Sequence, residues 1–327
     1  MKLTVLGAGA WGTALAAHWT PAHEVVLWGR NAAELDAMRT QGVNARYLPD
    51  CPLPAALAFE PDFDAACATA ELIVVSVPTH GFRATLEALT RRPALPPLVW
   101  VCKGFEPGSG KLPHQLVAEV LPTARTGVLS GPSFAQEVAH GYPTALTLAS
   151  ADAALARQLA EALSGQRMRI YAHDDVTGVE IGGALKNVMA IAAGICDGLQ
   201  LGHNARAALI TRGLAEMTRL GVRLGGHFET FMGLSGLGDL ILTTTGDLSR
   251  NRQVGLRLAR GQALEAILAD LGHVAEGVPT AREVDVLASG LGVDMPVTRA
   301  VCSILYEGLP AAQAVDALLN REIKAEF

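Results

Sequence analysis

One lysine of this 327-residue chain stands in a setting where an amine could carry a proton. Between Ile181 and Cys196 the only strongly polar side chains are Lys186 and Asn187. Burial disfavours a charged amine and lowers its pKa toward neutrality, which would make Lys186 a usable proton acceptor. The alternative is a lysine whose amine reaches solvent at the helix surface. Lysine is scarce here, with five residues against 21 arginines, so a chemical role is favoured.

Two further polar sites come directly after apolar runs that are predicted to be strands. Lys103 follows Leu98–Cys102, and Ser130-Gly131-Pro132-Ser133 follows another such run. Ligands meet sheets of this kind at the carboxyl ends of the strands. Gly131 and Ser133 could therefore offer N–H and hydroxyl groups to a polar ligand. The alternatives are a solvated loop lysine and an ordinary turn.

Two more candidates lie in the second half of the chain. Asp239 sits in the glycine-rich sequence GLSGLGDLIL, where it is either a site residue or a helix N-cap. Ser249-Arg250-Asn251 opens a helical stretch, with Ser249 as its predicted N-cap. A helix start that carries an arginine is suited to bind an anion. The alternative is a capped surface helix with Arg250 in water.

The amino terminus combines a strand, a glycine set and a helix. The apolar run Leu3–Leu6 stops at Gly7, and Gly9 and Gly12 complete a Gly-x-Gly-x-x-Gly pattern before an alanine-rich stretch. Gly7 permits a tight turn, Gly9 lets the backbone approach phosphates, and Gly12 allows close packing of the helix on the strand. The free N–H groups of the helix start would hold the pyrophosphate of a dinucleotide. The alternatives are a turn that binds nothing and a secretory signal, which the glycines disfavour.

The end of the second apolar run, Glu24–Trp28, bears on which dinucleotide binds. NAD sites usually place Asp or Glu about 20 residues past the glycines. This chain has Arg30 there, and an arginine can pair with a 2′-phosphate. NADP is therefore favoured over NAD. An ordinary exposed arginine, or use of both cofactors, stays open.

Composition excludes several classes of protein. Half of the residues are hydrophobic and 18% are charged, which suits a well-buried globular chain with room for two domains. A net charge of −6 argues against nucleic acid as the main partner. The five cysteines form no C-x-x-C pair and the nine histidines show no metal-binding spacing, so we expect a reducing compartment, the cytoplasm, and no metal. The apolar segment 181–201 contains glycines and polar residues, and a buried helix is expected rather than a membrane span.

Periodicity divides the chain near residue 175. Residues 1–175 are predicted to form a Rossmann-type, doubly wound α/β domain that binds the dinucleotide, with a parallel sheet covered by helices on both faces. Residues 176–327 are predicted to form an all-helical, substrate-binding domain. Ligand chemistry is expected between them. The further predicted strands are 72–77, 98–102, 127–129, 145–149 and 168–171, and the predicted helices are 82–91, 112–121, 153–163, 176–198, 204–224, 251–260, 280–289 and 298–306.

With these residues in place, the chain resembles the bacterial NAD(P)-dependent glycerol-3-phosphate dehydrogenase family. The likeness runs through GAGAWGTALA, LWGRN, SVPTH, CKGFE, SGPSFAQE, NARAALITRGLAEM, GLSGLGDLILT, SRNR and AEGVPTA. Its most specific part is the stretch from Val179 to Met217, because other two-domain dehydrogenases share the architecture and lack these strings.

The resemblance implies a role for each matched position. Lys186 would be the catalytic proton acceptor, and Lys103 would contact both cofactor and substrate. The resemblance adds Lys103, Ala135, Arg250, Val274 and Glu276 to the cofactor contacts predicted from the amino-terminal pattern, which are Gly7, Gly9, Ala10, Trp11, Gly12 and Arg30. The implied substrate contacts are Lys103, Gly131, Ser133, Lys186, Asp239, Ser249, Arg250 and Asn251. Residue 10 is Ala where the family often has Ser, which removes one hydroxyl contact to phosphate.

The implied reaction is reversible hydride transfer between dihydroxyacetone phosphate and glycerol 3-phosphate, which supplies phospholipid backbones. The residues leave two alternatives open. One is another dehydrogenase of this architecture, acting on a hydroxy acid or a ketopantoate-like compound. The other is a non-enzymatic NADPH-binding regulator. A homodimer is expected only because such dimers are common.

Overall fold

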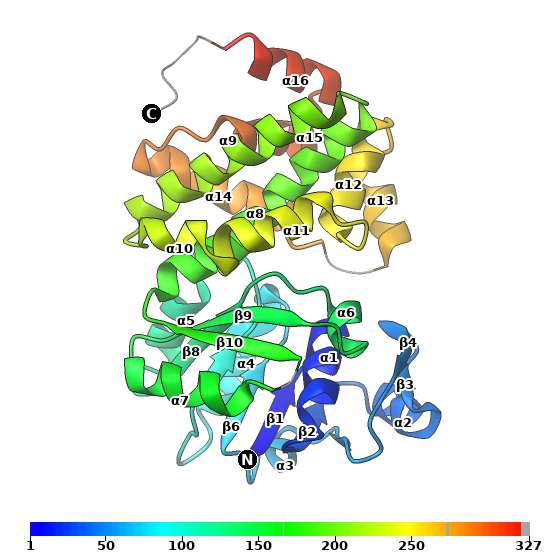
Figure 1. The fold of residues 1–327 in the computed structure, drawn as a ribbon, viewed down its shortest axis with the longest axis vertical. Helices are drawn as coiled ribbons and strands as arrows, with labels where there is room; N and C mark the ends of the chain where they lie inside the picture. Colours follow the sequence, from blue (N-terminus) through cyan, green and yellow to red (C-terminus); the bar gives the residue numbers. More distant parts are fainter. Residues whose placement is uncertain (166, 273–274, 322–327) are drawn as a thin grey trace. The chain divides into compact units, whose positions relative to one another are not determined.

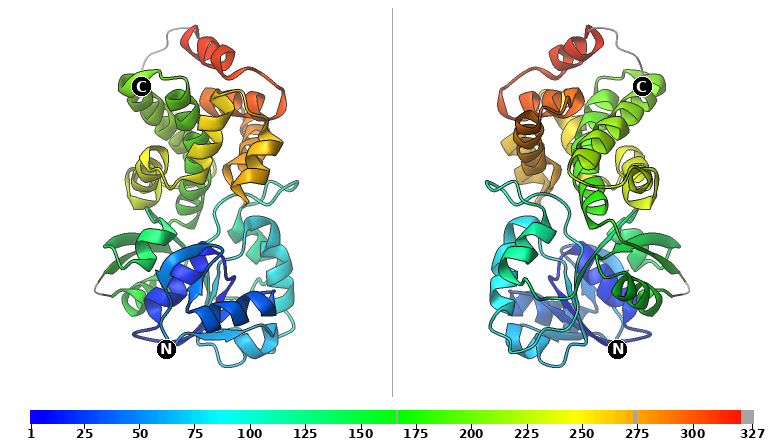
Figure 2. Two further views of the ribbon diagram at one scale, coloured as in Figure 1. Left: turned by 90° about the vertical axis from the view of Figure 1, so that its right-hand side faces the viewer. Right: turned by 90° about the vertical axis from the view of Figure 1, so that its left-hand side faces the viewer.

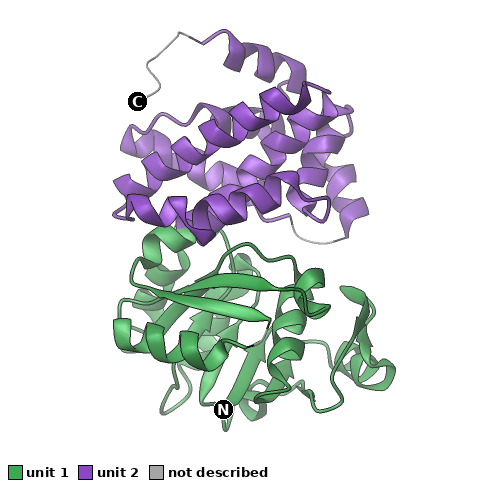
Figure 3. Ribbon diagram, in the orientation of Figure 1, with its two compact units in different colours: residues 1–106, 111–180 green, residues 107–110, 181–327 purple. Residues whose placement is uncertain are grey.

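The structure, a computed structural model, describes residues 1–165, 167–272 and 275–321. The chain divides into two compact units (Figure 3). Unit 1 comprises residues 1–106 and 111–180, and unit 2 comprises residues 107–110 and 181–327. The helix α8 (Val176–Gly198) contributes its first residues to unit 1 and the rest to unit 2. The functional division at residue 175 stays a prediction.

Within the described residues, unit 1 is built on an eight-stranded sheet with the strand order β10-β9-β8-β7-β6-β1-β2-β5 (Figure 1). The strands are β1 (Lys2–Leu6), β2 (Glu24–Trp28), β5 (Ala58–Glu60), β6 (Leu72–Val75), β7 (Leu98–Trp100), β8 (Thr126–Ser130), β9 (Thr144–Ala149) and β10 (Met168–His173), and a hairpin is formed by β3 (Val43–Asn44) and β4 (Leu48–Pro52). Because β1 lies between β2 and β6, the strand order reverses at β1, which is where ligands bind in such sheets.

Helices cover both faces of this sheet. Successive residues of a strand point to opposite faces, so Val5 joins one buried apolar cluster and Leu6 the other. The cluster around Val5 includes residues of α1 and α7, and the cluster around Leu6 includes residues of α4 and α5. The helices are α1 (Ala10–Trp19), α2 (Ala32–Gln41), α3 (Phe63–Cys67), α4 (Thr79–Leu89), α5 (Pro113–Val120), α6 (Ala135–Ala139) and α7 (Ala153–Leu163). The predicted Rossmann-type sheet is confirmed.

The sheet departs from the expected parallel arrangement at one edge. β9 runs antiparallel to β8, and β10 is parallel to β9. The expectation of a wholly parallel sheet was therefore wrong for these two strands. Alternation of apolar residues predicts a strand but carries no information on its direction.

Unit 2 is helical, as predicted (Figure 2). After α8 come α9 (Gly202–Arg223), α10 (Phe228–Met232), a π-helical turn η1 (Leu234–Gly238), α11 (Asp239–Thr245), α12 (Arg250–Ala259), α13 (Leu264–Leu271), α14 (Gly277–Leu291), α15 (Pro296–Tyr306) and α16 (Ala311–Leu319). The helix predicted over 176–198 coincides with α8. α8 is long and apolar enough to cross a membrane, but its apolar window is wholly buried, as in the core helix of a folded domain.

Glycines set how closely α8 and α12 approach. A Cβ on Gly194 would lie 2.1 Å from the carbonyl oxygen of Arg252, and one on Gly255 would lie 2.0 Å from that of Ile191. Both distances are far below van der Waals contact, so the two backbones touch where they cross. This contact fixes the first half of α12, which follows Ser249, against the C-terminal part of the lysine-bearing helix.

Candidate functional site

The glycine set forms the predicted turn between β1 and α1. Gly7 has φ +122°, a conformation that favours glycine. A Cβ on Gly12 would lie 2.0 Å from the carbonyl oxygen of Gly7, so only glycine permits this packing. A Cβ on Gly9 would meet no atom of the described chain within 4 Å, which leaves room for a ligand to approach its backbone.

The first turn of α1 keeps its amide groups available. Its N-cap is Gly9, which has no side chain to accept their hydrogen bonds. Ala10 and Trp11, which open the helix, are half-buried. Uncapped amides and the positive end of the helix dipole suit a phosphate group. The residues present therefore fit a dinucleotide pyrophosphate.

A buried asparagine that the sequence reasoning missed supports this turn. Asn44 donates through Nδ2 to the carbonyl oxygen of Ala8 at 3.1 Å and to Oγ1 of Thr13 at 2.8 Å. It comes from the hairpin strand β3, more than 30 residues along the chain. A single Asn in a loop-like sequence carries no pattern that would have revealed this role.

Arg30 follows β2 and is exposed. Asn31 caps α2 by accepting from the backbone N–H groups of Ala33 and Glu34. Among the described residues no carboxylate forms an ion pair with Arg30, unlike Arg39, which pairs with Asp36. The guanidinium of Arg30 is thus available to an anionic ligand, as the NADP interpretation requires.

Three predicted residues of unit 1 meet at the ends of two neighbouring strands. β7 and β8 pair in parallel, so the segments that follow them lie side by side. The carbonyl oxygen of Gly131 accepts from Nζ of Lys103 at 3.2 Å and from Oγ of Ser133 at 3.0 Å. Gly131 has φ +136° and is buried. Ala135 begins α6, which packs against α1.

In unit 2 the structure brings together Lys186 and Asp239. Nζ of Lys186 donates to Oδ1 of Asp239 at 2.5 Å, and the exposed fractions of the two residues are 7% and 0%. The alternative of a lysine that reaches solvent is therefore wrong. Thr243 donates to the same carboxylate oxygen at 3.3 Å. Asp239 is the first residue of α11, whose N-cap is Gly238, so the N-cap interpretation of Asp239 is also wrong.

Close packing on α8 produces the Lys186–Asp239 pair. A Cβ on Gly182 would lie 2.3 Å from the carbonyl oxygen of Ser235, in the π-helical turn that leads into Asp239. Because Gly182 and Lys186 are one helical turn apart, this contact places the turn beside the lysine. Single π-helical turns are frequent at functional sites.

The start of α12 is held by a chain of amide side chains. Nδ2 of Asn251 donates to Oδ1 of Asn187 at 2.9 Å, and Oδ1 of Asn251 accepts from the N–H of Gly277 at 3.0 Å. Ser249 caps the helix as predicted, accepting from the N–H of Arg252. The side chain of Asn251 is thus held by two contacts within the protein, which fixes its orientation at the start of α12. Asn187 was recognised as polar, but its partner lies too far along the chain to be read from spacing.

The remaining predicted contacts are spread over unit 2. Arg250 is exposed in the first turn of α12. Glu276 is half-buried and precedes α14. Val274 lies outside the described residues. No group of three or more metal-ligating side chains occurs in the part of the chain that the structure describes.

Comparison with known proteins agrees with this geometry. The model for the N-terminus of NAD-dependent glycerol-3-phosphate dehydrogenase matches residues 2–156, and the model for its C-terminus matches residues 175–316. The chain belongs to this family. The resemblance inferred from the sequence is confirmed.

Individual relatives match over the full length of the chain. It is 76% identical to a glycerol-3-phosphate dehydrogenase (NAD(P)+) from Thiobacillus denitrificans, with 100% of both chains covered. The solved glycerol-3-phosphate dehydrogenase of Coxiella burnetii is 43% identical, with a TM-score of 0.94 over 98% of this chain and 99% of that one. A glycerol-3-phosphate dehydrogenase from Saccharomyces cerevisiae is 28% identical, with a TM-score of 0.82 over 97% and 98% of the two chains.

Proposed function

We propose that the protein catalyses reversible hydride transfer between sn-glycerol 3-phosphate and dihydroxyacetone phosphate, with NADP or NAD as the cofactor. The observation that carries the proposal is the buried pair of Lys186 and Asp239, because it provides a proton-carrying amine where a purely structural helix would place an apolar residue. The full-length similarity to enzymes of that name supports it.

The dinucleotide would be held by residues of unit 1. The N–H groups of Ala10 and Trp11 at the start of α1 face no side-chain cap and would bind the pyrophosphate, with Gly9 allowing close approach. The exposed guanidinium of Arg30 would pair with a 2′-phosphate. When bound, the nicotinamide supplies or accepts the hydride.

Lys186 would move the proton that accompanies the hydride. In reduction of the ketone, Nζ–H of Lys186 donates its proton to the carbonyl oxygen as that oxygen gains negative charge. In oxidation the neutral amine takes the hydroxyl proton from the same oxygen. Asp239 accepts a hydrogen bond from Nζ and so directs the remaining N–H bonds of the amine. Protein burial excludes the water that would otherwise compete for the proton.

The phosphate of the substrate would bind at the first turn of α12. That turn offers backbone N–H groups, a positive helix end and the exposed guanidinium of Arg250. Charge-assisted hydrogen bonds are worth roughly 1.5–3 kcal/mol each, so the phosphate would supply much of the affinity. Lys103, Gly131 and Ser133 remain proposed contacts because they meet at the ends of β7 and β8 and match the family motifs. Glu276 of unit 2 is a proposed contact from the resemblance alone.

The cellular setting is also part of the proposal. We infer a cytoplasmic enzyme that works in the reducing direction and supplies glycerol phosphate for phospholipid synthesis. Cys51, Cys67, Cys196 and Cys302 are free thiols in the structure, as suits a reducing compartment. A homodimer stays a prediction from the frequency of such dimers.

A substrate panel tests the proposal. The full chain is mixed with NADPH or NADH, and the absorbance at 340 nm is followed with dihydroxyacetone phosphate, dihydroxyacetone, ketopantoate or a 2-keto acid. We expect oxidation of the reduced cofactor only with the phosphorylated ketone. Turnover with ketopantoate or a keto acid instead would identify another dehydrogenase of this architecture, and cofactor binding without any turnover would identify a regulator.

A further inference from the structure

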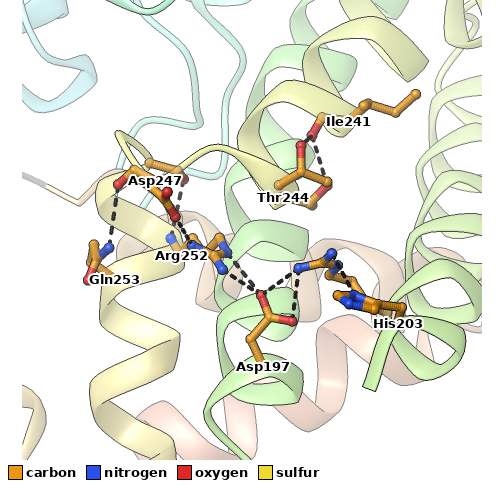
Figure 4. A network of polar contacts seen from close by, with 10 residues as sticks. Asp197, His203, Ile241, Thr244, Asp247, Arg252 and Gln253 are labelled. Atoms are coloured by element: carbon orange, nitrogen blue, oxygen red, sulfur yellow. Dashed lines mark hydrogen bonds and ion pairs between the residues drawn. The ribbon is translucent and has the colours of Figure 1, made fainter. Parts of the chain in front are cut away.

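An ion-pair cluster joins the end of α8 to the first turn of α12 (Figure 4). The guanidinium of Arg252 donates to Oδ2 of Asp197 through Nε at 3.1 Å and through Nη2 at 2.7 Å. Its Nη1 donates to Oδ1 of Asp247 at 2.9 Å. The side chains of Arg252 and Asp197 are only 11% and 15% exposed, whereas that of Asp247 is 93% exposed. The pair of Arg252 and Asp197 is therefore the buried part of the cluster.

Both charges of this pair stand at unfavourable ends of their own helices. Asp197 lies in the last turn of α8, where the helix dipole is negative. Arg252 lies in the first turn of α12, where the dipole is positive. Neither charge stabilises the helix that carries it. The ion pair between the two helices therefore explains why a carboxylate and a guanidinium occupy these positions. Arg206 of α9 also donates to both oxygens of Asp197, at 3.2 Å.

The pair fixes the proposed phosphate site relative to the proposed proton carrier. Asp197 and Lys186 lie on the same face of α8, about three turns apart. Arg252 is two residues past Arg250, in the turn that would bind the phosphate. The backbone of Arg252 also touches α8, since a Cβ on Gly194 would lie 2.1 Å from its carbonyl oxygen. A shift of this turn along α8 would change the distance between the phosphate contacts and Nζ of Lys186.

We propose that Asp197 and Arg252 are positioning residues for the substrate phosphate, a role that rests on the proposed function. Their bond holds the first turn of α12 at one position along α8. A misplacement of about 1 Å in such a site can cost on the order of 10²-fold in rate. The donors of Arg252 point to Asp197 and Asp247, and the carboxylate of Asp197 would repel an anion, so neither residue is assigned a direct contact with the phosphate.

The substitution Asp197→Asn separates positioning from simple electrostatics by the sign of its effect. It removes a negative charge near the proposed phosphate site. If Asp197 acted only through its charge, KM for dihydroxyacetone phosphate would fall, because an anionic substrate would be repelled less. If Asp197 positions the helix start, KM would rise.

The experiment measures kcat and KM for dihydroxyacetone phosphate, KM for NADPH and the thermal unfolding midpoint. The variants are Asp197→Asn, Arg252→Gln, their double variant and Arg252→Lys. Arg257→Gln is the matched control, because Arg257 lies on the same helix and pairs with Asp270 at the surface. We expect KM for dihydroxyacetone phosphate to rise about tenfold or more in both single variants, while KM for NADPH stays within about twofold.

KM for dihydroxyacetone phosphate in the double variant should be no higher than in the more impaired single variant, because the two substitutions remove the same bond. The KM of Arg252→Lys for dihydroxyacetone phosphate should lie between the values of the wild type and Arg252→Gln. This variant provides the measurement if Arg252→Gln does not fold. An unchanged or lower KM in folded Asp197→Asn, or equal effects in Arg257→Gln, would overturn the inference. If the wild-type chain did not reduce dihydroxyacetone phosphate at all, the proposed function itself would fail, and the inference with it.

Discussion

The amine of Lys186 lies 2.5 Å from Oδ1 of Asp239, and both residues are buried in unit 2. Burial disfavours a charged amine, whereas a carboxylate at this distance favours it, so the two effects oppose each other. Replacing only one partner of the pair lowers the stability of the fold, because the other partner is left as an unpaired buried charge.

The first prediction concerns that cost. Asp239→Asn should lower the free energy of unfolding by about 3–5 kcal/mol, since it leaves the ammonium of Lys186 without its carboxylate. Adding Lys186→Met should restore part of the loss, because no charge is then left buried. Urea unfolding followed by circular dichroism measures both. A double variant that is less stable than Asp239→Asn would show that the pair does not behave as a unit.

The second prediction concerns cofactor choice. Arg30→Gln should raise Kd for NADPH by about tenfold or more and leave Kd for NADH nearly unchanged, since only NADPH carries the 2′-phosphate. Fluorescence titration with each reduced cofactor measures this. Arg39→Gln is a control, because Arg39 lies on the helix that follows Arg30 and already pairs with Asp36. Equal losses for both cofactors would show that Arg30 does not read the 2′-phosphate.

The third prediction concerns the crossing of α8 and α12. Gly255→Ala would push a Cβ to 2.0 Å from the carbonyl oxygen of Ile191 and force the helices apart. We expect a loss of about 1–3 kcal/mol in stability and a higher KM for dihydroxyacetone phosphate. Gly290→Ala is the matched control, since Gly290 is a helical glycine whose added Cβ meets no described atom within 4 Å. It should be neutral or stabilising by up to about 1 kcal/mol. Identical behaviour of the two variants would contradict this explanation of the crossing.

The fourth prediction concerns pH. Glu180 is buried in unit 1 and accepts from Nε1 of Trp100 at 2.8 Å and from the N–H of His114 at 2.9 Å, while its other oxygen contacts Nδ1 of His114. Burial lowers the pKa of His114, but the hydrogen bond and charge of Glu180 outweigh it and raise the pKa above the ordinary 6.5. The raised pKa of His114 therefore contributes stability that is fully present below about pH 6.5 and is lost as the pH rises through the raised pKa.

The test compares wild type with His114→Gln. The free energy of unfolding of the wild type should fall more steeply from about pH 6 to about pH 9 than that of the variant. Chemical denaturation at several pH values measures the two slopes. Parallel slopes would mean that the pKa of His114 is not raised in the folded protein.

Local features of the site were predictable because each is encoded by neighbouring residues. Gly7 and Gly12 revealed the turn through their spacing after a short apolar run. Ser249 revealed a helix start because an N-cap acts over three residues. Lys186 was conspicuous because it interrupts an apolar helix. These signals suffice for the two-part fold and for the local geometry of the glycine turn and the start of α12.

Features that depend on distant segments could not be read in this way. Asp239 followed a glycine-rich stretch that was compatible with a cap, and only the packing of Ser235 on Gly182 sets it beside Lys186. Asn44 supports the glycine turn from a separate hairpin, and Asn187 meets Asn251 from another helix. The reversed direction of β9 follows from the connection between strands, which periodicity does not encode.

The most direct test of the central claim compares the wild type with Lys186→Met in the reduction of dihydroxyacetone phosphate by NADPH, followed at 340 nm. Lys2→Gln, at an exposed lysine, is the control. We predict that folded Lys186→Met, still binding NADPH, loses roughly 10²–10⁴ in kcat while Lys2→Gln keeps the wild-type rate. Wild-type turnover by folded Lys186→Met would contradict the assignment of proton transfer to this amine.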